Sequence, residues 1–152
     1  MLAFDGMRYV LISLLGLCAV AAQAIPQAKR KIPCKTPELA SSCYWTRGRL
    51  SVYNGNPPWR MWKVGTHRIL AIFSGPSAFP PRNDQDSFNP ELPPNLELAY
   101  KAEEPRKARL KELLPDPAFA DFEVCPLEPE RKGEMQAVCI ESVKDIFLQK
   151  SR

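Results

Sequence analysis

The chain has 152 residues, a formal net charge of +4 at pH 7 and a single histidine. A chain of this length forms one domain with a core of ordinary size. One histidine cannot complete a histidine-containing zinc set by itself, and no two cysteines have the Cys-x-x-Cys spacing, so we expect no structural metal. The mild basic charge favours an anionic partner only where the cations cluster in the sequence.

The N-terminus has the pattern of a secretory signal peptide. Residues 9–22 are apolar and follow Arg8, and the Ala-Gln-Ala sequence at 22–24 is a small-x-small cleavage site. The apolar run is shorter than the ~18–20 residues that span a bilayer, which disfavours the alternative of a retained membrane anchor. We therefore expect cleavage near Ala24, a secreted or periplasmic protein, and no stable membrane insertion after cleavage.

The chain without residues 1–24 keeps an even number of cysteines. An even number in an exported protein predicts two disulfides. The four residues are Cys34, Cys43, Cys125 and Cys139. Residues 25–42, which precede the predicted strands, are basic and contain several prolines. We expect them to form an irregular N-terminal arm that is tied down at Cys34 if that residue is bridged.

Three consecutive strands are predicted next, over residues 44–53, 59–64 and 67–73. The first two show the alternation of a half-buried strand, and the third is apolar on both faces, which suggests that it is covered on both sides. Asn54-Gly55 is the strongest short-range signal for a hairpin turn between the first two strands. Gly48 inside the first strand predicts a bulge or a bend of the sheet.

A proline-rich loop follows at residues 74–94, which hold six of the sixteen prolines. A loop this long in a compact domain is functional, mobile or both. A helix is predicted from Pro105 to Leu114, because proline suits the first turn of a helix. Leu110, Leu113 and Leu114 would form its apolar stripe, and residues 96–104 would be a separate, weaker turn.

The last third of the chain predicts a hairpin of two strands, at residues 118–127 and 135–143. Residues 146–148 form either a short extension or a C-terminal turn. The order of three strands, a helix and two strands is that of the OB-fold, a five-stranded Greek-key barrel. We therefore predict a mainly β, OB-like barrel domain over residues 43–148 with one short helix between the third and fourth strands. A generic small barrel or sandwich is the alternative.

The hairpin register bears on the disulfide pairing. If the turn centres on Lys132, then Cys125 and Cys139 lie directly opposite each other, at about the distance that a disulfide needs. This favours Cys125–Cys139 and leaves Cys34–Cys43 as the second bond. The competing arrangement has Cys43 tying the first strand to the final hairpin.

The sequence offers no convincing catalytic set. His67 has Arg68 beside it and no carboxylate nearby in the sequence to orient it. Asp121 and Glu123 lie two apart on one strand face, which is more typical of an exposed polar face than of a catalytic pair. No Gly-rich phosphate loop is present. We predict a protein without catalytic residues or cofactors, and keep a small hydrolase that uses His67 as an alternative.

A binding surface has stronger support in the sequence. Residues 43–73 hold all three tryptophans, two of the four tyrosines and five cationic side chains, with no Asp or Glu. In OB-folds the outer face of strands two and three, with the flanking loops, is the usual ligand surface. Aromatic rings there stack on bases or sugars while cations follow an anionic backbone. The residues predicted to bind a ligand are Arg49, Tyr53, Trp59, Arg60 and Lys63. In the alternative interpretation, Trp62 belongs to the core and the arginines form a solvated strand face.

Four segments together resemble a group of small exported bacterial proteins without an assigned activity: GRLSVYNGNP, RMWKVGTHR, FADFEVCPLEP and MQAVCIES. The resemblance covers residues 43–142 and implies an exported domain, with no catalytic residue carried over. We therefore expect an exported, non-catalytic binding module for an anionic polymer or an acidic protein surface. The alternative is a secreted inhibitor or accessory subunit that acts through the proline-rich loop.

Overall fold

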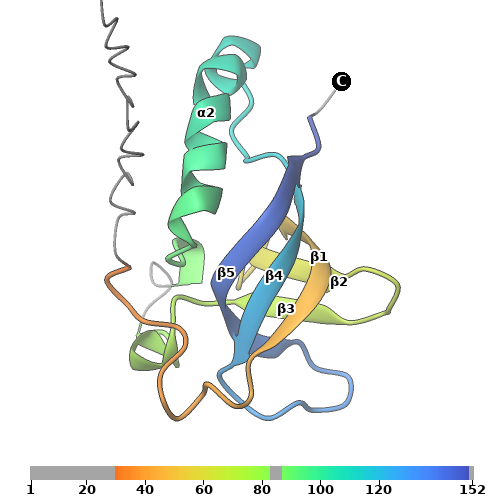
Figure 1. Ribbon diagram of the computed structural model, residues 1–152. Coiled ribbons are helices and arrows are strands. Elements are labelled where there is room, and N and C mark those ends of the chain that lie inside the picture. The colour runs from red at the N-terminus through yellow and green to blue at the C-terminus, as the bar shows by residue number, and fades with distance from the viewer. Residues whose placement is uncertain (1–29, 83–86, 151–152) are drawn as a thin grey trace, which may run out of the picture.

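The computed structural model describes residues 30–82 and 87–150 (Figure 1). The predicted signal segment lies outside these residues. The strands are β1 (Tyr44–Val52), β2 (Trp59–Lys63), β3 (Ile69–Ile72), β4 (Ala118–Pro126) and β5 (Gln136–Leu148). The 3-10 helix η1 (Pro76–Ala78) and the helix α2 (Pro94–Leu110) lie between β3 and β4.

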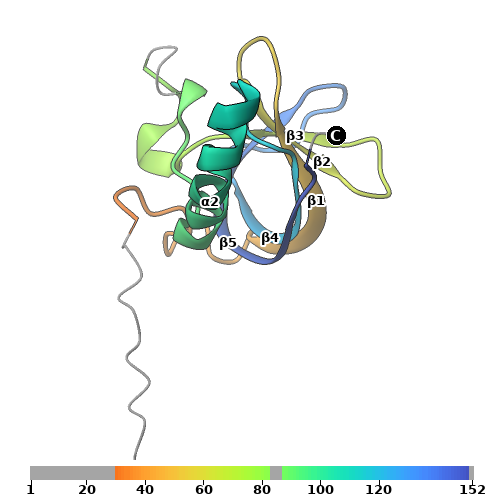
Figure 2. The ribbon, with the colours of Figure 1, turned by 90° about the horizontal axis from the view of Figure 1, so that it is seen from above.

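The five strands close into a barrel in the order β1-β2-β3-β5-β4. β3 and β5 pair in parallel, and the other neighbouring strands pair antiparallel. Seen from above in Figure 2, the strands form a ring with α2 beside it. A closed five-stranded barrel with a helix between the third and fourth strands is the OB-like fold that the sequence predicts, so the predicted fold class is confirmed.

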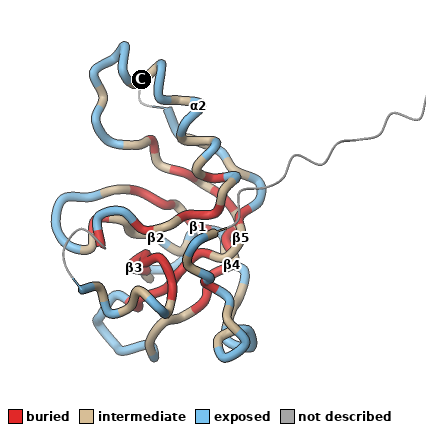
Figure 3. Tube along the Cα trace, turned by 90° about the vertical axis from the view of Figure 1, so that its left-hand side faces the viewer, coloured by how far each residue is buried: buried red, intermediate tan, exposed pale blue. Residues whose placement is uncertain are grey.

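The barrel is filled by side chains from alternate positions of the strands. Leu50, Met61, Leu70, Phe122 and Ile140 are all fully or almost fully buried in one core cluster. Figure 3 shows that burial is concentrated in the strands, while the loops and the far end of α2 are exposed. Burying a large apolar side chain stabilises the fold by about 1.5–3 kcal/mol, so this cluster is the main source of stability.

Gly48 lies where two core side chains approach the backbone closely, and not at a bulge. The pairing of β1 with β2 and with β4 runs through Gly48 without a register shift, so the predicted bulge is absent. A Cβ at this position would lie 2.4 Å from Sδ of Met61 and 3.1 Å from the ring of Phe122. Glycine is needed because these two large side chains share the barrel interior above it. The register shifts occur instead between β4 and β5.

Both faces of β3 are covered from Leu70 to Ile72, as the apolar sequence predicts, whereas Ile69 at its start is exposed on the outer face. Leu70 and Ile72 point into the barrel core. Ala71 and Phe73 on the outer face pack against Phe79, which follows η1, and the two phenylalanine rings have centroids 5.2 Å apart. The outer face of β3 in this region is therefore not available to a ligand.

The helix prediction is wrong in its start and in its apolar stripe. Instead of beginning at Pro105, α2 begins at Pro94 and contains Pro105 in its interior. Leu96 in the first turn is fully buried in the barrel core, and Tyr100 in the second turn packs edge-on against Trp59 with ring centroids 5.9 Å apart. These tertiary contacts outweigh the backbone hydrogen bond that Pro105 cannot donate. The leucines predicted as its apolar stripe are all exposed: Leu110, Leu113 and Leu114.

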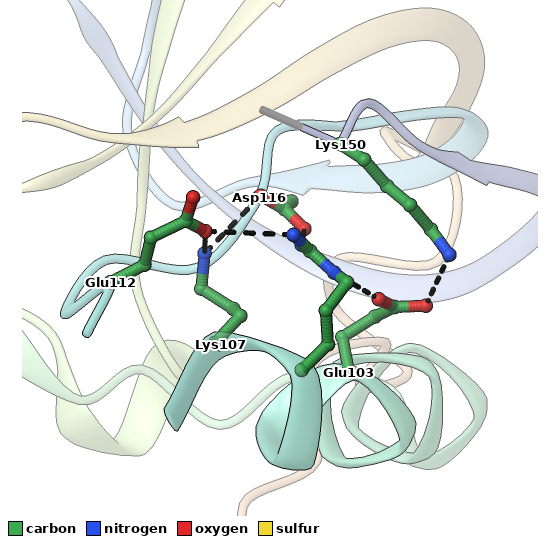
Figure 4. A network of polar contacts seen from close by, with 6 residues as sticks. Glu103, Lys107, Glu112, Asp116 and Lys150 are labelled. Atoms are coloured by element: carbon green, nitrogen blue, oxygen red, sulfur yellow. Dashed lines mark hydrogen bonds and ion pairs between the residues drawn. The ribbon is translucent and has the colours of Figure 1, made fainter. Parts of the chain in front are cut away.

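The far end of α2 is fastened to the barrel by a network of ion pairs (Figure 4). Its members are Glu103, Arg106, Lys107, Glu112, Asp116 and Lys150. Asp116 is almost fully buried and accepts hydrogen bonds from both Arg106 and Lys107. Hydrogen bonds from Arg106 and Lys150 lower the pKa of Glu103. The three cationic and three anionic side chains balance in charge, so the network holds the end of α2 against the barrel and is a structural feature.

The four cysteines form two disulfides, as predicted, but the preferred pairing is wrong. The bonds are Cys34–Cys139 and Cys43–Cys125. Cys125 and Cys139 do lie opposite each other in the register of β4 and β5. Cys43 directly precedes β1, whose Tyr44 pairs with Val124, so Cys43 also reaches Cys125 from the other side of β4. Cys125 forms its bond with Cys43, and Cys139 bonds to Cys34 of the N-terminal arm.

The N-terminal arm is attached to the barrel by polar contacts as well as by Cys34. The guanidinium of Arg30 donates hydrogen bonds to the carbonyl oxygens of Ser74, Glu91 and Ile140. Burial lowers the pKa of Arg30, and Glu91 opposes this effect. The Glu91 carboxylate in turn accepts the backbone N–H groups of Lys31 and Ile32. The arm, orange in Figure 1, is therefore part of the folded domain from Arg30 onwards.

Candidate functional site

The outer face of the barrel carries a row of large side chains that crosses all five strands. The strand register places Ile69 beside Trp62, Trp62 beside Arg49, Arg49 beside Phe119, and Phe119 beside Phe147. We call these five residues the cross-strand row. Neighbouring strands lie 4.7–4.9 Å apart, so the row is roughly 19 Å long. Ile69, Trp62 and Phe147 are 44%, 39% and 62% exposed.

Arg49, at the centre of the row, is held between two aromatic residues. Its Nη1 donates a hydrogen bond to the hydroxyl of Tyr53 at 3.2 Å, and its guanidinium carbon lies 5.8 Å from the ring centroid of Phe119. Arg60 also contacts Tyr53, and its guanidinium carbon lies 5.6 Å from the ring centroid of Tyr53. Nε of Arg60 donates a hydrogen bond to the carbonyl oxygen of Pro57. Each cation–π contact at an exposed site contributes about 0.5–1 kcal/mol. Both guanidinium groups are therefore held in place on the surface.

A second group of cations lies on the other side of the row. Asp121 pairs in register with Arg47 on β1 and with Lys144 on β5, and its carboxylate is 3.4 Å from Nη1 of Arg47. Nζ of Lys144 lies 4.5 Å from the ring centroid of Trp45, which is 48% exposed. Positive charge thus flanks the cross-strand row on both sides, with Arg60 on one side and Arg47 and Lys144 on the other.

The arm contacts two acidic residues near this face and forms an ion pair with one of them. Lys35 forms an ion pair with Glu123 at 2.6 Å, and its backbone N–H donates to Glu141. By contrast, Arg49, Arg60 and Lys144 form no ion pair with any carboxylate in the part of the chain that the structure describes. The surface around the cross-strand row is therefore cationic and aromatic, with Asp121 as an internal counter-charge.

Of the five residues that the sequence predicts as ligand-binding, three lie together on the outer face and two lie elsewhere. Arg49, Tyr53 and Arg60 come together on the outer face, as described above. Trp59 lies on the inward-facing side of β2 and packs against the core, and its Nε1 donates to the carbonyl of Phe88 at 3.1 Å. Lys63 lies at the other end of β2, with Nζ 4.8 Å from the ring centroid of Tyr44. Neither residue shares the face that carries the cross-strand row.

Four aromatic residues of this face are not among the predicted ligand-binding residues: Trp45, Trp62, Phe119 and Phe147. The interpretation that Trp62 belongs to the core is wrong, because Trp62 is exposed and its Nε1 donates a hydrogen bond to the carbonyl oxygen of Thr66. Phe119 and Phe147 belong to distant parts of the sequence and reach the face only through the pairing of β4 with β1 and β5. The sequence pattern that could identify Phe119 as outward-facing is its position between Ala118 and Ala120. In a strand, neighbouring residues point to opposite faces, so Phe119 points away from the core that the two alanines enter.

The described part of the proline-rich loop packs against the barrel. Ser87 and Leu92 are buried, Phe88 receives the hydrogen bond from Trp59, and Glu91 holds the arm. Its described residues thus contribute mainly to packing. His67 lies exposed in the turn between β2 and β3, next to a shallow pocket lined also by Arg68 and Glu134.

Within residues 30–82 and 87–150, no three His, Cys, Asp or Glu side chains are grouped so that they could hold a metal ion. Over the same residues, no helix has the length and hydrophobicity needed to cross a membrane. Comparison with family models found no match, and neither the curated proteins nor the solved structures include a significant match to this chain.

Proposed function

We propose that this protein is an exported, non-catalytic module that binds an anionic partner through the outer face of its barrel. The observation that carries the proposal is the position of Arg49 and Arg60, which are fixed by Tyr53 and Phe119 beside an exposed row of apolar side chains. A guanidinium that is already ordered loses little conformational entropy when it binds an oxyanion, and its planar fork suits bidentate recognition.

Two features support export. The first is the signal-like pattern of residues 1–24, which lie outside the described part of the chain. The second is the presence of two disulfides, since such bonds form and persist in oxidising compartments. The bonds also support the binding surface, because Cys34–Cys139 anchors the arm whose Lys35 forms an ion pair with Glu123.

The double substitution Arg49→Ala/Arg60→Ala tests the proposal. We expect the native protein to bind dextran sulfate, used as a generic polyanion, with an affinity that falls as salt rises. A cation close to a polyanionic surface contributes about 1 kcal/mol, so loss of two should weaken binding roughly 30-fold and reduce its salt dependence. Affinity can be measured by fluorescence titration at several ionic strengths.

The matched control is Lys101→Ala/Arg109→Ala, which removes the same charge from exposed positions of α2. This control should keep most of the native affinity. Equal losses in the two double variants would mean that only net charge matters, and would reject the outer face as the site.

A further inference from the structure

The cross-strand row contains more exposed apolar surface than binding to a purely ionic polymer needs. Four of its five residues are apolar or aromatic, and Ile69, Trp62 and Phe147 are each more than one-third exposed. Val64, in the turn that follows β2, is also 40% exposed. A group of large exposed apolar side chains together with arginine is typical of a site that binds another protein.

The composition of the row is that of a protein-binding hot spot. Tryptophan, tyrosine and arginine are the residues that most often dominate binding energy at protein interfaces, and they cluster near the centre of the contact. Here Arg49 lies between Trp62 and Phe119 in the register and contacts Tyr53. Among the described residues, Nε and Nη2 of Arg49 have no hydrogen-bond partner, so the guanidinium can donate two parallel bonds to a carboxylate.

The barrel geometry indicates how such a partner would lie. The cross-strand row runs across paired strands and not along a sheet edge, so a partner bound on the row cannot pair there as an added strand. Recognition must then use side chains of the outer face. An extended peptide rises 3.2–3.4 Å per residue, so a row of roughly 19 Å would contact about six residues.

The arrangement favours a peptide over a nucleic acid. Bases stack on aromatic faces, but Ile69 at one end of the row has no ring, and neither has the exposed Val64 after β2. Aliphatic and aromatic side chains together suit apolar side chains of a partner. The flanking cations Arg47, Arg60 and Lys144 suit carboxylates on either side of those apolar side chains.

We infer that the cross-strand row binds an acidic protein segment whose apolar side chains lie on the row and whose carboxylates pair with Arg49 and the flanking cations. This inference rests on the proposed function and narrows its anionic partner to one class. The apolar contacts provide affinity that does not depend on salt, and the carboxylates provide orientation.

A comparison of polymer probes tests the inference. The probes are a random copolymer of glutamate and tyrosine, poly-glutamate of similar length, dextran sulfate and a single-stranded oligo-dT. We expect the copolymer to bind at least tenfold more tightly than poly-glutamate at the same ionic strength. We also expect the difference to persist at high salt, because the added tyrosines contact the apolar row.

The variant Ile69→Thr/Phe147→Thr removes apolar surface from the two ends of the row and leaves every cation in place. It should bind the copolymer no better than poly-glutamate. The matched control, Leu113→Thr/Leu114→Thr, removes exposed apolar surface near the end of α2 and should keep the preference.

Equal binding of the copolymer and poly-glutamate would overturn the inference, and so would a preference that survives in the Ile69→Thr/Phe147→Thr variant. Tighter binding of oligo-dT than of the copolymer would overturn it in favour of base stacking. In each of these cases the proposed function would still hold if dextran sulfate binds the native protein and binds the Arg49→Ala/Arg60→Ala variant more weakly. Failure of all four probes to bind would reject both.

Discussion

The double variant Cys43→Ala/Cys125→Ala is expected to lower the free energy of unfolding by about 2–5 kcal/mol. The bond joins residues 82 positions apart in the sequence and links the start of β1 to the end of β4. Its loss lets the unfolded chain explore many more conformations, and it also leaves a fully buried position at Cys125 less well filled. Urea unfolding of the oxidised protein, followed by tryptophan fluorescence, measures the change.

The pairing itself can be checked on the native protein. Digestion without reduction should release one linked peptide pair that contains Cys34 and Cys139 and another that contains Cys43 and Cys125. A linked pair containing Cys125 and Cys139 would contradict the structure and restore the pairing that the hairpin register favours.

For the stability prediction, an unchanged unfolding midpoint in the Cys43→Ala/Cys125→Ala variant would mean that the Cys43–Cys125 bond contributes nothing to stability.

The substitution Phe122→Ala is expected to cost about 3–5 kcal/mol of stability. Phe122 is fully buried at the centre of the barrel, and the absence of a side chain at Gly48 makes room for its ring. Alanine would leave a cavity that a closed barrel cannot collapse to fill. Phe147→Ala is the matched control, because Phe147 is 62% exposed on the outer face. It should change stability by no more than about 0.5 kcal/mol.

Equal losses in the two phenylalanine variants would contradict the orientation of β4 and β5. This comparison therefore also tests whether Phe147 belongs to the cross-strand row. If Phe147 pointed into the core, its exposure and its pairing with Phe119 would both be wrong.

The strands could be predicted because their signal is local. In β1 and β4, apolar residues alternate with polar or charged ones, and turn residues bound each strand, so period two identifies the elements without any knowledge of their neighbours. The order of the elements then favours an OB-like barrel. The start of α2 could not be found in this way, because Leu96 and Tyr100 stabilise the first turns through contacts with the distant strands.

The disulfide pairing shows a different limit of sequence reasoning. The predicted register of Cys125 and Cys139 is correct, yet Cys125 has a second cysteine within reach on the strand at its other side. Nothing in the sequence indicates whether Cys125 bonds to the cysteine across the β4–β5 pair or to the one across the β1–β4 pair. Closure of the barrel, which brings β1 beside β4, decides the pairing.

The candidate surface could be predicted only in the part that lies close together in the sequence. Arg49, Tyr53 and Arg60 flank one hairpin and do meet on one face. Phe119 and Phe147 come from the other end of the chain, and long-range pairing places them beside Arg49. The predicted Trp59 faces inward because the turn after β1 fixes its position on β2, and composition alone does not determine that orientation.

The most direct test of the binding surface is acrylamide quenching of the tryptophans with and without saturating dextran sulfate. Trp45 and Trp62 are exposed on the outer face, whereas Trp59 packs against the core and α2. We expect bound polymer to shield the two exposed rings and reduce the quenching constant, with the effect reversed by high salt. If polymer binds at low salt and quenching is unchanged, the ligand lies elsewhere and the outer face is not the binding site.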